Sequence, residues 1–113
     1  DPRMTQPEDL SYVISGRHLI AETPDLRVQI LTLERGEDIP WHRHSVVADT
    51  FVCLDGPMVI ETRSPDADHV LRTGESLEVA PGTAHRVSGQ DDGRCRFVIV
   101  QGIGAHDFIP IDG

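Results

Sequence analysis

Two histidines and an aspartate lie close together in the segment PWHRHSVVAD, residues 40–49. His42 and His44 are separated by one residue, so on a β-strand both side chains project from one face, with Cα atoms roughly 6.5 to 7 Å apart. Two imidazoles at that spacing can converge on one metal ion. Asp49 follows the short stretch SVVA and opens the next strand, where a tight turn would fold its carboxylate back toward the pair. The segment therefore raises the prediction of a metal site.

A third histidine, His85, follows the turn APGT at the start of another strand, where a closed barrel would bring it across from the first two. Three imidazole nitrogens and one carboxylate oxygen form a borderline donor set that suits one divalent ion of Fe, Mn, Ni, Co, Cu or Zn. The alternative is that each histidine is an ordinary hydrogen-bonded strand residue and no metal binds. His18, His69 and His106 lie outside this pattern and are not expected to be ligands.

Short strands are the elements that must position these residues. Turn-forming residues recur at short intervals, separated by runs of about five to ten residues rich in Val, Ile, Leu, Phe and Thr, which is typical of an all-β sandwich or barrel. No helix of convincing length fits between the turns, and antiparallel pairing is favoured. Asp55 and Gly56 form the strongest hairpin signal. The expected strands span residues 17–23, 26–36, 50–63 (two strands hinged at Gly56 and Pro57), 69–73, 76–80, 85–89 and 94–102.

The length of the chain predicts one domain, residues 1–113, and its 38% hydrophobic residues are enough for a single core. No apolar run approaches the roughly 20 residues that a membrane span requires, so no membrane partner is expected. The formal net charge of −9 would repel a phosphate backbone, and the arginines are scattered, which argues against a nucleic-acid partner. Met4 is the expected natural start, after residues 1–3, and the cytoplasm is the expected location.

Both cysteines, Cys53 and Cys95, lie inside apolar stretches without CxxC spacing. Free cysteine is among the residues most often buried, so two buried free thiols are predicted. A disulfide between two strands is the alternative.

The segment GEDIPWHRHSVVADTFVCLDG, residues 36–56, resembles the first motif of the cupin superfamily. In that motif a glycine is followed after five residues by His-x-His, then by a glutamate and, six residues later, by a second glycine. Gly36, the two histidines and Gly56 fall in place here. Asp49 stands where the family has Glu.

The segment GESLEVAPGTAHRVSG, residues 74–89, resembles the second cupin motif. Gly74, the Pro-Gly turn and His85 match it. Gly89 stands where the motif ends in Asn, and Ala80 holds a position where Pro is common. The two motifs occur in the family's order, separated by a short intermotif segment.

The resemblance implies a single cupin domain with its barrel over residues of about 17–103, folded as an all-β double-stranded β-helix, or jelly-roll, barrel. It also implies His42, His44 and His85 as metal ligands and puts Asp49 in the carboxylate position. Aspartate is one carbon shorter than glutamate, which removes roughly 1.5 Å of reach. A three-histidine site with an open face is therefore the alternative.

Strand alternation predicts a largely apolar cup around the cation, as small-molecule sites usually are. Asp49, Phe51 and Cys53 share one face of their strand. Trp41 is expected at the rim or on the outer sheet, and His106 is a candidate proton carrier alongside Asp49 and Glu61. The predicted substrate pocket comprises Phe51, Cys53, Val59, Glu61 and Val87, with Met58 and Ile60 as the alternative to Val59 and Glu61 on their strand.

Two function classes are consistent with these features. The first is a metal-dependent enzyme acting on a small organic molecule, with dioxygenase chemistry of the kind that similar cupins run favoured and isomerase or lyase chemistry possible. The second is a non-enzymatic cupin module that binds or senses a small ligand. The apolar residues in segments 10–15 and 106–111 predict a homodimer in which at least one of them covers a neighbour's sheet edge.

Overall fold

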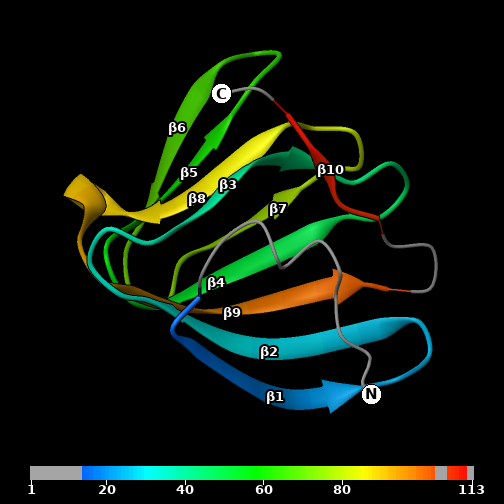
Figure 1. Ribbon diagram of the computed structural model, residues 1–113, viewed down its shortest axis with the longest axis horizontal. Coiled ribbons are helices and arrows are strands. Elements are labelled where there is room, and N and C mark those ends of the chain that lie inside the picture. Colours follow the sequence, from blue (N-terminus) through cyan, green and yellow to red (C-terminus); the bar gives the residue numbers. More distant parts are fainter. Residues whose placement is uncertain (1–13, 104–106, 112–113) are drawn as a thin grey trace.

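The computed structural model describes residues 14–103 and 107–111 of the chain. Their strands form two five-stranded antiparallel sheets, and Figure 1 shows one sheet below the other. This architecture confirms the predicted all-β double-stranded β-helix. Among the described residues, no helix is long and apolar enough to cross a membrane.

The strands of the first sheet lie in the order β1-β2-β9-β4-β7, and those of the second in the order β10-β3-β8-β5-β6. The bounds are β1 Gly16–Glu22, β2 Leu26–Leu33, β3 Asp38–Arg43, β4 Asp49–Asp55, β5 Met58–Thr62, β6 Ala67–Leu71, β7 Ser76–Val79, β8 His85–Gly89, β9 Cys95–Gly102 and β10 Ile109–Pro110, with a 3₁₀ turn at Gln90–Asp92.

The core lies between the two sheets because the central strands alternate buried and partly exposed residues. In β4, Asp49, Phe51 and Cys53 are buried and the residues between them are half-buried. Phe51 and Phe97 are the largest fully buried side chains, and their ring centroids lie 5.7 Å apart. Cys53 and Cys95 are both buried and free, as predicted.

The predicted hairpin at Asp55 and Gly56 is wrong. β4 and β5, which flank it, belong to different sheets, so the turn carries the chain from one layer to the other. A Cβ on Gly56 would lie 2.7 Å from the sulfur of Cys53 and 2.9 Å from the backbone nitrogen of Met58. Glycine is therefore required here because the backbone is closely packed where the chain passes from one sheet to the other, and not because of a two-residue hairpin turn.

Two strands of the second sheet were not among the predicted runs. β3 carries the first histidine of the cluster, and β10 comes from the C-terminal segment. Ile109 pairs with Arg43 and Pro110 with His42, so this segment covers the edge of β3 in its own chain rather than in a neighbour. The N-terminal segment expected to cover an edge lies mostly outside the described residues, and the homodimer stays a prediction.

Gly89, at the end of β8, lies where the backbone leaves no room for a side chain. A Cβ at this position would lie 1.9 Å from the carbonyl oxygen of Gly93, although the backbone angles of Gly89 are ordinary for any residue. Because the obstructing atoms belong to the backbone, Gly89→Ala is expected to lower the free energy of unfolding by about 3 kcal/mol or more, measured by urea denaturation.

The matched control is Gly36→Ala, at a positive φ of 84° with nothing within 4 Å of the added Cβ. Its expected cost is only the conformational strain, about 1 to 2 kcal/mol. An equal or smaller cost at Gly89 would contradict the packing.

Candidate metal centre

A bulge in β3 directs the first histidine into the barrel. Along β8 the pairing steps from Val87 to His85, while along β3 it steps from Ile39 to His42, so β3 contains one extra residue. Such a bulge re-aims the side chains that follow it. His42 consequently faces the interior directly opposite His85, and both are buried.

The next two members come from either side of the loop between β3 and β4. His44 is the first residue after β3, and Asp49 is the first residue of β4. The loop folds Asp49 back so that its Oδ2 lies 2.8 Å from Nε2 of His44. The predicted return of the carboxylate across this turn is therefore observed.

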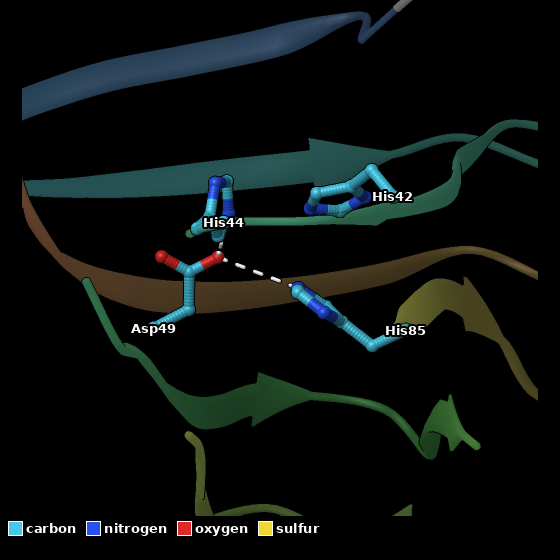
Figure 2. Close-up of side chains that lie close together, drawn as sticks. All are labelled: His42, His44, Asp49 and His85. Carbon is cyan, nitrogen blue, oxygen red and sulfur yellow. Dashed lines mark hydrogen bonds and ion pairs between the residues drawn. The ribbon is translucent and has the colours of Figure 1, made fainter. Parts of the chain in front are cut away.

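The four side chains converge on one point inside the barrel, as Figure 2 shows. One potential ligand atom from each of His42, His44, Asp49 and His85 lies within 4.8 Å of the other three. The ring centroid of His42 is 4.1 Å from that of His85 and 4.9 Å from that of His44. No member is more than 3% exposed. The cluster could hold a metal ion out of contact with bulk water.

Backbone carbonyls orient all three imidazoles. Nδ1 lies 2.7 Å from the Pro40 oxygen in His42 and 2.8 Å from the Thr83 oxygen in His85. In His44, Nδ1 makes a short hydrogen bond to the Asp107 oxygen. A carbonyl oxygen only accepts, so each Nδ1 donates its proton. This arrangement turns each Nε2 toward the shared centre, which is how backbone carbonyls hold histidine ligands of metals.

Without a metal, Asp49 and His44 form a buried ion pair. Burial alone would raise the pKa of Asp49, but the hydrogen bond from His44 and the nearby imidazole of His85, at 3.5 Å, outweigh it and hold that pKa well below its usual range. Burial alone would lower the pKa of His44, but the hydrogen bond and charge of Asp49 outweigh it and raise that pKa. A proton on Nε2 of His44 therefore holds the carboxylate beside the imidazoles with which it would hold a metal.

His42 behaves differently because it lacks such a partner. Burial, followed by the charge of His85, lowers its pKa to about 3. The ring is therefore neutral at physiological pH, the state in which imidazole binds metals. The ring of His42 stacks on that of Phe108, with ring centroids 4.3 Å apart.

The residues present fit a divalent transition metal. Within the described residues, two buried side-chain atoms have no hydrogen-bond partner, Oδ1 of Asp49 and Nε2 of His85. Buried polar atoms are rarely left unpaired, because each costs about 1 to 3 kcal/mol. Both atoms belong to the cluster, so a cation at its centre would satisfy them. Three nitrogens and one oxygen suit Zn or a neighbouring first-row metal rather than Ca or Mg.

Metal binding is expected to release a proton from His44 at pH values where the metal-free protein still holds that proton. The raised pKa of His44 means that the metal-free protein keeps this proton as pH rises, so metal affinity should increase with pH and level off above that pKa. His42 contributes no proton there because its pKa is about 3. Isothermal titration calorimetry in buffers of different ionisation enthalpy measures the release.

Asp49→Asn provides the control, since it removes the negative charge that raises the pKa of His44. Proton release at neutral pH should fall in this variant. Release that is the same in wild type and variant would contradict the ion pair.

Sequence reasoning missed the C-terminal segment as a support for the site. Beyond its bond to His44, Asp107 accepts hydrogen bonds from Ser45, at 2.7 Å from the backbone nitrogen and 2.6 Å from the hydroxyl. Phe108 adds the stacking on His42. The segment therefore fixes two of the three histidines. No local pattern signals this role, because it depends on the chain returning to β3 after a separation of 62 residues.

The structure places the predicted pocket residues in two different settings. Phe51, Cys53 and Val87 are buried in the core, and the ring of Phe51 lies 6.2 Å from that of His85. Val59 and Glu61 are not brought to the cluster, because they lie on the partly exposed face of β5.

On that strand the alternative pair, Met58 and Ile60, is fully buried. The charge of Glu61 explains the orientation, since its carboxylate is paired with Arg86 at 2.7 Å.

The remaining candidates lie away from the cluster or outside the described residues. His18 is exposed on β1, and His69 lies on β6 with Nε2 at 3.2 Å from the Thr62 hydroxyl. His106 lies outside the described residues. Trp41 is half-buried, with the guanidinium of Arg63 4.0 Å from its ring centroid, as expected for a position outside the barrel core.

Comparisons with known proteins are consistent with this geometry. A family model described as the cupin domain matches residues 29–101. No curated protein matches the chain.

Among solved structures, an uncharacterised protein with a double-stranded β-helix domain from Klebsiella pneumoniae has a TM-score of 0.70 at 21% identity, covering 100% of both chains. A cupin-2 domain protein from Shewanella frigidimarina has a TM-score of 0.67 at 21% identity, covering 85% of this chain and 88% of that one. An oxalate oxidase has a TM-score of 0.67 at 13% identity, covering 77% of this chain and 46% of that one. These likenesses concern the fold.

Proposed function

This chain belongs to the cupin family, and from that premise we propose that it is a metal-dependent enzyme acting on a small organic molecule. The proposed cofactor is one divalent transition metal held by His42, His44, Asp49 and His85. The observation that carries the proposal is that three Nε2 atoms face one centre, where Nε2 of His85 and Oδ1 of Asp49 have no hydrogen-bond partner. In a cluster with a purely structural role, such buried atoms would be expected to be hydrogen-bonded.

The chemistry favoured is oxygenation of a substrate that binds through oxygen atoms. A metal that takes five or six ligands would keep coordination positions for such a molecule beside these four residues, as would a four-coordinate metal held by the three histidines alone. The apolar surroundings of Phe51 and Val87 would strengthen the electrostatic interactions there. Oxalate oxidase, a structural neighbour, is an enzyme on the same fold. Isomerase or lyase chemistry would use the same polarisation of a bound oxygen.

Within the described part of the chain, Asp49 is the one carboxylate of the cluster. Bound through one oxygen, it would hold the metal. Its second oxygen could then accept a proton from a bound substrate. Glu61, the other carboxylate predicted for proton transfer, is paired with Arg86 and lies on the other face of β5.

The test is metal analysis of the purified protein followed by oxygen uptake with a panel of catechols, thiols and diketones. One equivalent of Fe, Mn, Ni, Co, Cu or Zn per chain is expected, with substrate-dependent oxygen uptake for the oxygenase. Asp49→Asn should retain more metal than activity. A loaded protein that consumes no oxygen and converts no member of the panel would contradict the oxygenase.

The second candidate is a small-ligand binding or sensing module. It is favoured by how completely the cluster is enclosed, with no member more than 3% exposed. In that case the metal would be structural or absent, and a ligand would bind without being converted.

A further inference from the structure

A cavity of about 300 Å³ lies between β5 and β6 of one sheet and β7 of the other. β6 and β7 are terminal strands of their sheets, so the cavity lies at one lateral edge of the two layers. Its volume is at the lower end of the roughly 300 to 1,000 Å³ typical of ligand pockets. It fits a small metabolite rather than a polymer.

Three residues that line this cavity are direct neighbours of the cluster formed by His42, His44, Asp49 and His85. Val79 pairs with Asp49 across β7 and β4, and Thr62 pairs with His85 across β5 and β8. Thr83 also lines the cavity, and its carbonyl oxygen accepts the hydrogen bond from Nδ1 of His85. The cavity and the cluster therefore share a boundary, formed by Val79, Thr62 and Thr83.

The lining combines aliphatic residues with the charged residues Arg63 and Glu78 and with one hydrogen-bonded polar pair. Leu77, Val79 and Ala67 supply aliphatic surface, while the hydroxyl of Thr62 lies 3.2 Å from Nε2 of His69. An imidazole and a hydroxyl can together make more hydrogen bonds than the single one that joins them. The pair can therefore donate to or accept from a hydroxyl or carboxylate oxygen of a ligand. Apolar walls with a few placed polar groups are the usual composition of a small-molecule site.

We propose that this cavity binds the organic substrate of the metal centre, with His69 and Thr62 as its recognition pair. The substrate class is a small molecule with an apolar body and a hydroxyl or carboxylate group, which the pair holds at the boundary that the cavity shares with the cluster. This inference rests on the proposed function and adds to it the location of the substrate and the groups that select it.

The experiment follows backbone amide signals of the zinc-loaded, ¹⁵N-labelled protein by nuclear magnetic resonance during titration with salicylate, mandelate and lactate. At least one probe is expected to shift, saturably, the amides of β6, β7 and Thr83. His69→Leu and Thr62→Val should each weaken that binding about tenfold, since each removes a half-buried hydrogen-bonding group from the cavity wall. Zinc content should stay at one per chain in both variants.

His18→Leu, on exposed β1, is the matched control and should bind the probe as wild type does. Absence of saturable shifts around the cavity at about 10 mM of every probe, a concentration that reveals millimolar dissociation constants, would overturn the inference. Unchanged affinity in both variants would overturn it as well.

Failure of the proposed function gives a separate signal. A wild type that takes up no zinc or other transition metal would contradict the metal enzyme. In that protein, saturable probe binding that depends on His69 and Thr62 would still support the cavity as a ligand site, and its absence would overturn it.

Discussion

His85→Ala is expected to lower metal affinity by at least about a hundredfold and to leave the purified protein without stoichiometric metal. Loss of a partner that merely orients a ligand costs about 10 to 100-fold, and His85 is proposed as a ligand itself. Its Nε2 is buried, has no hydrogen-bond partner and lies 3.5 Å from Oδ2 of Asp49, directed at the other members of the cluster. Metal content by plasma mass spectrometry and affinity by competition with a chelator measure the effect.

The control for this variant is His18→Ala, which removes an imidazole from an exposed strand. It should keep full metal content. Equal metal content in the two variants would show that His85 is not a ligand, provided that circular dichroism confirms both to be folded.

Metal loading should raise the midpoint of thermal unfolding by more than about 10 °C. A ligand at about 1,000 times its dissociation constant stabilises the native state by about 4 kcal/mol, and each kcal/mol is worth roughly 4 °C in a domain of this size. The stabilisation arises because four polar side chains are buried in the metal-free protein, two of them with atoms that have no hydrogen-bond partner in the described structure. A bound metal would remove this free-energy penalty. Differential scanning calorimetry of chelator-treated and zinc-loaded protein measures the shift.

Two comparisons make the thermal shift specific. Calcium should give little stabilisation, because it prefers oxygen ligands, and zinc should give little in His85→Ala. A shift of the same size with calcium, or in the variant, would assign the stabilisation to a site other than the cluster.

Much of the site could be predicted because it depends on local geometry. The one-residue spacing of His42 and His44, the short loop before Asp49 and the turn before His85 each constrain where a side chain points. The structure brings these four residues together. Coordination of a metal stays a prediction.

Features that depend on contacts between segments far apart in the sequence could not be predicted in the same way. Asp107 and Phe108 contact the cluster only because β10 pairs with β3. The Asp-Gly pair at residue 55 has the composition of a hairpin turn, but in a jelly roll consecutive strands often change sheets, and composition does not distinguish the two cases.

The orientation of β5 is a case where the sequence held a usable signal. Alternation leaves two possible inner faces, Val59 with Glu61 or Met58 with Ile60. Burying an ionised carboxylate is costly unless it is paired. That cost favours the second option, which is the one observed.

A crystal structure of the metal-loaded protein, with anomalous scattering recorded at the absorption edge of the bound metal, tests the central claim most directly. The account predicts one anomalous peak per chain inside the barrel, about 2.0 to 2.2 Å from the Nε2 atoms of His42, His44 and His85. A loaded crystal with no peak among these rings, or with its peak on other residues, would contradict the account.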